Sequence, residues 1–126
     1  MIRNATLDDI PVLIAIEELS WKPNLRASVD SIRQRISRYP LGQYVVEVDG
    51  LVKGVLYTQR VCYVNDIVSK GFAGQACLHD PTGEYVQLLA INVPSGKHAY
   101  FNALTDIPIT HNNLTLCLSS PICQQS

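Results

Sequence analysis

The clearest hydrophobic pattern in the chain is the run EYVQLLAINV, which predicts a strand over residues 84–93. Apolar side chains occupy both faces of this run, as they do in a central strand that is covered on each side. After Val93 the pattern weakens, because Ser95-Gly96 interrupts the chain and Pro108 ends a short helical pattern. We therefore expect the tail, residues 94–126, to be irregular.

Two earlier apolar runs predict a β-hairpin. Residues 43–48 and 52–61 are rich in β-branched and aromatic side chains, and Asp49-Gly50 between them is typical of a tight turn. A short β-compatible segment over residues 1–5 predicts a further strand. With the strand over 84–93, these segments predict a mixed, mostly antiparallel sheet.

Helical periodicity predicts two helices in the first third of the chain, over residues 7–21 and 28–38. Thr6 and Ser28 precede them as candidate N-caps, and Asp9 adds an acidic side chain at the positive end of the first helix. Helices and strands in this order predict an α+β domain.

Composition narrows the class of function. A chain of 126 residues predicts one domain, and a net charge of −1 gives no electrostatic reason to expect nucleic acid or an anionic membrane as a partner. No apolar run reaches the length of about 18 residues that a membrane span needs. The first residues lack a secretory signal pattern, so the expected location is cytoplasmic.

Cysteine and histidine residues do not form a metal-binding motif. The four cysteines have no C-x-x-C spacing, and His79, His98 and His111 lie far apart in the sequence. We expect free thiols and no metal. His79, within HDPTG, is interpreted as a turn residue.

Several segments resemble one acyltransferase superfamily. The segments IRNATLDDIPVLIAIEE, YVVEVDGLVKGVLYTQRV and VQLLAINV resemble the start, the hairpin and the fourth strand of the GNAT (GCN5-related N-acetyltransferase) fold. More narrowly, LSWKPNLRAS, IRQRISRYPLGQ and LHDPTGEYVQLLAINV resemble GNAT-type domains of polyketide synthase loading modules. The resemblance covers residues 1–93, which implies the N-terminal part of a GNAT-like acyltransferase domain and a divergent tail over 94–126.

The resemblance implies an acyl-CoA site at the end of the fourth strand. In this family the fourth and fifth strands splay apart and the pantetheine arm lies between them, so Leu89, Ala90, Ile91 and Val93 are expected to face the cofactor. A Q/R-x-x-G-x-G/A loop should then hold the pyrophosphate at a helix N-terminus. Gly96 is the one glycine after Val93, so this motif is missing from the chain.

Two residues are candidates for the catalytic pocket by resemblance. Trp21 resembles a tryptophan that lines the acyl pocket, and its alternative role is that of a core aromatic residue. Thr115 lies in a TLC segment that is similar to one in the polyketide-type domains, and the alternative is a chance match of three residues.

Two main hypotheses follow for function. The first is an acyltransferase that uses acetyl-CoA or malonyl-CoA, with malonyl-CoA decarboxylation and S-acetyl transfer to an acyl-carrier protein in the polyketide subtype. The alternative is an inactive truncated remnant, or a module that binds a carrier protein or another partner without catalysis. The missing phosphate-binding motif favours the alternative. A chain with an arbitrary tail is a third option that the sequence leaves open.

Two surface features bear on partners. Arg33, Arg35 and Arg38 are interpreted as a solvated helix face, which could also meet an acidic acyl-carrier protein. A strand over 84–93 without its full set of neighbours exposes an apolar edge, so we expect it to dimerise, to pair with a strand from the tail, or to aggregate.

Overall fold

The computed structural model describes residues 1–62, 79–94, 98–107 and 115–118, the last of these as backbone. The strands are β1 (Ile2–Asn4), β2 (Tyr44–Val48), β3 (Leu51–Val61), β4 (Tyr85–Asn92) and β5 (Thr115–Leu118). The α-helices are α1 (Ile10–Ser20), α2 (Val29–Arg38) and α4 (His98–Thr105), and short 3-10 turns span Leu7–Asp9, Pro23–Leu25 and Pro40–Gly42.

The described strands form one sheet in the order β1-β2-β3-β4-β5. The first three pairings are antiparallel, and β5 pairs with β4 in parallel through Tyr85↔Thr115 to Leu88↔Leu118. This arrangement confirms the α+β class and the mixed, mostly antiparallel sheet. The strand from the tail that pairs with β4 is one of the three outcomes expected for that edge.

The tail contains more regular structure than its sequence pattern predicts. We expected residues 94–126 to be irregular, but α4 and β5 lie within them. Helix α4 packs Tyr100, Phe101 and Leu104 against the sheet. An eight-residue helix is marginal by itself, so its apolar contact with the sheet is what stabilises it.

The hairpin and the helix starts form as their local sequences indicate. Asp49 and Gly50 both have positive φ, 53° and 77°, as a type I′ turn requires. Ser28 accepts a hydrogen bond from the Ser31 backbone N–H at 3.1 Å, and the Asp9 carboxylate accepts one from the Thr6 N–H at 2.8 Å. These short-range contacts set where β2 ends, where β3 and α2 begin, and where the 3-10 turn before α1 begins.

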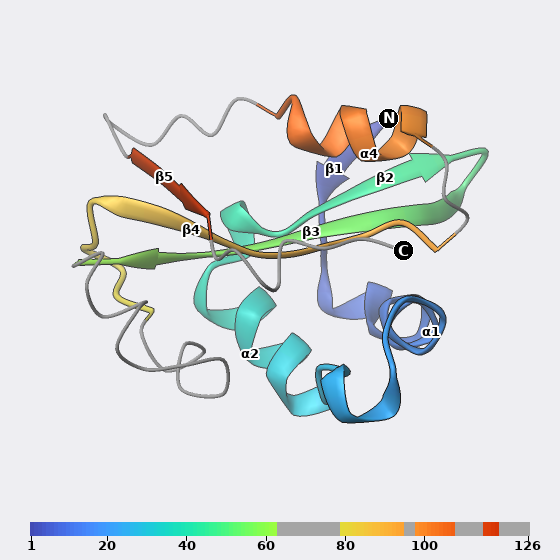
Figure 1. Cartoon of the computed structure of the whole chain (residues 1–126), viewed down its shortest axis with the longest axis horizontal. Coiled ribbons are helices and arrows are strands. Elements are labelled where there is room, and N and C mark those ends of the chain that lie inside the picture. The colour runs from blue at the N-terminus through green and yellow to red at the C-terminus, as the bar shows by residue number, and fades with distance from the viewer. Residues whose placement is uncertain (63–78, 95–97, 108–114, 119–126) are drawn as a thin grey trace.

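The sheet is covered on both faces, as Figure 1 shows, with α1 and α2 on one side and α4 on the other. The first face carries the larger apolar core. Its buried members come from α1, α2 and the central strands, and include Leu13, Ile32, Tyr57, Leu89 and Ala90. The second core, under α4, includes Leu56, Leu88, Ile91, Val93 and Leu104.

A β-bulge interrupts β4 at Leu89. Tyr57 pairs with Ala90 and Thr58 pairs with Leu88, so Leu89 has no opposite residue on β3. Leu89 and Ala90 both pack into the core under α1 and α2, although neighbours in a regular strand point to opposite faces. Because of the bulge, Ile91 and Val93 lie on the same face as Leu88, under α4.

Gln43 takes the place of a strand partner beside this bulge. Its side chain is fully buried. Its Oε1 accepts from the Thr58 N–H at 3.0 Å, and its Nε2 donates to the carbonyls of Tyr39 and Thr58 at 3.0 and 2.8 Å. The Thr58 hydroxyl donates to the Gly42 carbonyl at 2.6 Å, and a Cβ on Gly42 would lie 2.2 Å from the Tyr39 ring. These contacts fasten the end of α2 to β3 opposite Leu88.

Arg3 joins the first strand to the first helical turn and to the hairpin. Its guanidinium donates to both oxygens of Asp9 at 2.8 Å and to Glu47 Oε2 at 3.0 Å. The hydrogen bonds from Arg3 lower the pKa of the Asp9 carboxyl, although burial opposes this. A group whose pKa is lowered by folding stabilises the protein above its unfolded pKa, and this contribution is lost as the pH falls.

We expect Gln43→Leu to destabilise the fold by about 3 kcal/mol, because it leaves the buried Thr58 N–H without its acceptor and removes a donor from the Tyr39 and Thr58 carbonyls. Gln34→Leu on exposed α2 surface is the matched control and should change the free energy of unfolding little. Urea unfolding measures both. Equal stability of the two variants would contradict this assignment of Gln43.

We expect Asp9→Asn to lower stability at pH 7 and to flatten its dependence on pH. The wild-type chain should lose the contribution of Asp9 as the pH falls below about 4, whereas the variant has no such contribution to lose. Urea midpoints at pH 7 and pH 3 test this, with exposed Asp30→Asn as control. The expectation fails if the difference between the two midpoints is the same in Asp9→Asn and in wild type.

Candidate functional site

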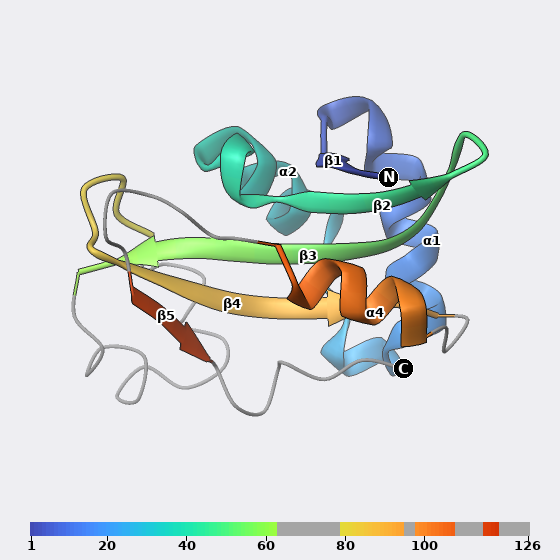
Figure 2. The same cartoon turned by 90° about the horizontal axis from the view of Figure 1, so that it is seen from above.

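Beyond the bulge, β4 has a described strand partner on one side only. Strand β3 pairs with β4 on one side as far as Asn92, whereas the described pairs with β5 end at Leu88. Figure 2 shows β5 alongside only the first part of β4, which continues beyond the end of β5. Within the described residues, the backbone from Leu89 to Asn92 therefore has no strand on the β5 side.

A chain of hydrogen bonds reaches this half of β4 from α1. Trp21 Nε1 donates to Asn92 Oδ1 at 2.9 Å, and Asn92 Nδ2 donates to Glu17 Oε1 at 2.7 Å. The second oxygen of Glu17 accepts from the Ala27 N–H at 2.8 Å. We call these four residues the Glu17 relay. It ties the end of α1 and the segment before α2 to the last residue of β4.

Glu17 is the one carboxylic acid among the described residues whose pKa is raised. The residue is only 3% exposed. Burial raises its pKa, and the hydrogen bond from Ala27 and the nearby charge of Arg35 offset part of this rise. A buried carboxyl with a raised pKa that is hydrogen-bonded to the end of β4 is a candidate for proton transfer.

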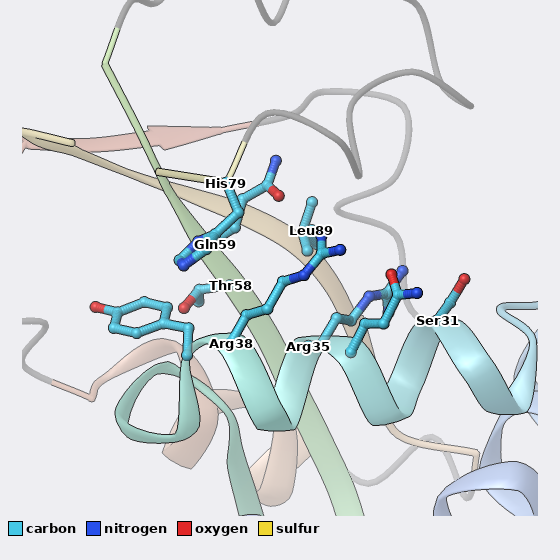
Figure 3. Close-up of a pocket in the computed structure, with 9 residues that line it drawn as sticks. Ser31, Arg35, Arg38, Thr58, Gln59, His79 and Leu89 are labelled. Atoms are coloured by element: carbon cyan, nitrogen blue, oxygen red, sulfur yellow. The ribbon is translucent and has the colours of Figure 1, made fainter. Parts of the chain in front are cut away.

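A pocket lies on the α2 face of the sheet, beside the bulge. Figure 3 shows Arg35 and Arg38 extending from α2 toward Leu89 on β4, with Thr58, Gln59 and His79 around them. The Nε and Nη1 atoms of Arg35 are buried and have no hydrogen-bond partner in the part of the chain that the structure describes. We call this the α2 pocket.

His79 forms one wall of the α2 pocket. Its Nδ1 accepts from the Arg60 N–H at 3.1 Å, and its ring lies 5.5 Å from that of Tyr39. Burial lowers its pKa, so the ring is neutral at pH 7. The nearby Arg38 backbone carbonyl offsets part of this lowering of the pKa. The carbonyl does not form a hydrogen bond of good geometry with His79 Nε2. We interpreted His79 as a turn residue, and it precedes the turn that begins at Asp80.

The four residues expected to face a cofactor all lie at or beyond the bulge. Leu89 and Ala90 pack under α1 and α2, and Ile91 and Val93 pack under α4. All four side chains are buried, so any ligand contact along this edge would come from their backbone. Their role in binding a cofactor stays a prediction.

The two candidate catalytic residues lie at opposite ends of β4. Trp21 is partly buried and contacts Asn92, at the bulge end. Thr115 starts β5 and pairs with Tyr85, about 23 Å from Asn92 along the strand. The structure does not bring Trp21 and Thr115 together, and only Trp21 adjoins the predicted cofactor strand.

Sequence reasoning did not identify Glu17, Asn92 and Arg35. Glu17 follows Leu13 and Ile16 on the buried face of α1, and Arg35 lies between Ile32 and Ile36 on that of α2. A charged residue at such a helical position was the available signal. The interpretation of the arginines as one solvated face was wrong for Arg35, while Arg33 is exposed beside Asp30.

Other expectations fall partly outside the described residues. The segment where a phosphate-binding loop would lie, residues 95–97, is outside them, and α4 begins at His98. The described residues contain no cluster of three or more potential metal ligands among histidine, cysteine and acidic side chains. None of the described helices is both long and apolar enough to cross a membrane.

We expect Asn92→Asp to cost about 2 kcal/mol at neutral pH, because it places a second carboxylate against Glu17 and removes its donor. The cost should shrink as the pH falls, since the folded state then gains by sharing a proton between the two groups. Urea unfolding at pH 7.5 and pH 5 tests this, with exposed Asn102→Asp as control. A cost that does not vary with pH would contradict the proximity of the two carboxyl groups.

Solved structures that resemble this chain closely include two GNAT-like domains. No family model and no curated protein sequence matches the chain. The GphF GNAT-like decarboxylase in complex with isobutyryl-CoA is 33% identical over 83% of this chain, with a TM-score of 0.76. The loading GNATL domain of CurA from Lyngbya majuscula is 30% identical over 83% of this chain, with a TM-score of 0.77.

The match extends over only part of each of these structures. The chain spans 54% of the length of each solved chain. The order of the strands and helices up to β4 and the position of the central strand agree with the partial GNAT fold expected from the sequence. By fold and by sequence identity to both structures, the chain is similar to GNAT-like domains and has a GNAT-like fold.

Proposed function

We propose that the chain binds the pantetheine arm of an acyl thioester along the half of β4 that follows the bulge. The observation that carries this proposal is that the described pairing of β4 with β5 ends at Leu88, whereas β4 continues to Asn92. Backbone N–H and C=O groups on the β5 side of this segment lack a strand partner among the described residues. The amide groups of a pantetheine arm can pair with such a strand edge, as an added strand does.

The same edge supports acyl transfer as the chemistry. Backbone N–H groups along a strand edge can stabilise the oxyanion that forms when a nucleophile attacks a thioester carbonyl. The Glu17 relay ends on this segment and supplies a buried carboxyl of raised pKa nearby. We assign to Glu17 and Asn92 the role of holding the edge in position, and to Glu17 that of a candidate proton acceptor.

The structural neighbours favour an acyl-CoA as the thioester. One of them, GphF, is described as a decarboxylase in complex with isobutyryl-CoA, and the other is a loading domain. For this chain we propose acetyl-CoA or malonyl-CoA as substrate, with decarboxylation of malonyl-CoA and S-acetyl transfer to an acyl-carrier protein as the finer reading. Trp21, beside Asn92, is the proposed wall of the acyl pocket.

The pyrophosphate end of CoA fits this chain less well than the pantetheine arm. Gly96 is the one glycine after Val93, so no G-x-G segment can bring backbone N–H groups against two phosphates. We therefore expect the adenosine diphosphate portion to add little affinity. An acyl-pantetheine should bind nearly as well as the corresponding acyl-CoA.

Isothermal titration of the full chain with acetyl-CoA, isobutyryl-CoA and S-acetyl-pantetheine tests the proposal. Deletion of Leu89 is the informative variant. The deletion makes Leu88 and Ala90 adjacent in the chain, and these two side chains already lie on opposite faces of the sheet. It therefore removes the bulge and leaves every other side chain of β4 on its present face. We expect it to weaken thioester binding by at least about tenfold, or 1.4 kcal/mol.

Leu89→Ala is the matched control, because it shortens the same side chain and keeps the bulge. It should bind the thioesters as the wild-type chain does, and cooperative unfolding should show that both variants fold. If the wild-type chain shows no saturable binding below millimolar concentration, the alternative holds: a module without catalysis that binds a carrier protein or another partner. Equal binding by the deletion variant would disprove the role of the bulge.

A further inference from the structure

The guanidinium of Arg35 lacks the acceptors that a buried cation requires. Its Nε and Nη1 atoms are buried and donate to no acceptor in the described part of the chain. Burial lowers the pKa of this side chain, yet an arginine keeps its charge at neutral pH. An uncompensated buried donor on a charged group is costly, so its retention calls for a compensating group.

The surrounding protein supplies only part of that compensation. The Arg35 guanidinium lies 4.7 Å from the centre of the Tyr57 ring, which attracts the cation through the ring face. Among the described residues, the Glu17 carboxylate attracts Arg35 through its charge, while its two oxygens accept from Asn92 and Ala27. Neither partner occupies the hydrogen-bonding positions of Nε and Nη1.

The α2 pocket places further polar groups around the same opening. Arg38 adds a second guanidinium from the next turn of α2, and Ser31 adds a hydroxyl from the turn before (Figure 3). Leu89, the bulged residue, gives the pocket an apolar wall. Two guanidinium groups beside a hydroxyl match the oxygens of a planar carboxylate or of a phosphate group.

We propose that the α2 pocket is an anion-binding site, in which Arg35 and Arg38 hold the carboxylate or phosphate group of a small ligand whose apolar portion lies against Leu89. The anion would accept from Arg35 Nε and Nη1 and so satisfy the two buried donors. This site lies on the α2 face of the sheet and does not depend on thioester binding at the β5 side of β4.

Titration of the full, CoA-free chain with sodium propionate and with inorganic phosphate tests the site, using amide NMR shifts at constant ionic strength against sodium chloride. We expect saturable shifts on α2 and around Leu89 with at least one of the two anions, and the stronger binder identifies the class of ligand. Arg35→Gln should weaken this binding by about tenfold or more. Arg33→Gln removes the same charge from the exposed face of α2 and should leave the affinity unchanged.

Arg35→Lys separates this site from a purely structural role, and it also serves if Arg35→Gln does not fold. It keeps the charge over Tyr57 but removes the planar pair of donors, so it should fold and still bind the anion more weakly. An anion concentration that saturates the wild-type chain should raise its thermal midpoint, and should raise that of Arg35→Lys by less. The absence of saturable wild-type binding, or equal weakening by Arg33→Gln and Arg35→Gln, would overturn the proposal.

Discussion

The extra residue at Leu89 decides which face of the sheet each later side chain of β4 occupies. A regular strand alternates faces, so one added residue exchanges the faces of everything that follows. Here the exchange is what lets Leu88, Ile91 and Val93 pack under α4 while Leu89 and Ala90 pack under α1 and α2. The bulge also marks the point where described pairing with β5 ends. Packing on both faces thus depends on one irregularity, and the described pairing with β5 ends at the same point.

Buried polar groups hold this irregularity in place. The Gln43 side chain makes the hydrogen bonds to the Thr58 backbone that a neighbouring strand would otherwise make. Asn92 is held between Trp21 and Glu17. Each such group is stable in the core only with its partners, since a buried donor or acceptor left without a hydrogen bond costs about 1–3 kcal/mol. Gln43 has its hydrogen bonds, whereas Arg35 Nε and Nη1 have none within the described residues. That contrast is why we assign Gln43 to the fold and Arg35 to a ligand.

Local signals in the sequence predicted much of the first part of the fold. Asp49-Gly50 specifies a turn through positive φ at both residues, and Ser28 specifies a helix start through its own side chain. Neither depends on distant residues, so both were predictable. Helix α4 and strand β5 were not, because a helix of eight residues and a strand of four residues are stable only against the sheet.

The sequence by itself determined the α+β class, the hairpin, the two first helices and the central strand, and it supported the resemblance to the GNAT family. Only the tertiary structure decided where the strand bulges and which polar groups meet. In EYVQLLAINV both faces are apolar, so a one-residue shift leaves no trace in the pattern. Glu17 and Asn92, or Arg35 and Tyr57, are far apart in the sequence, and their contacts exist only once α1, α2 and the sheet pack together.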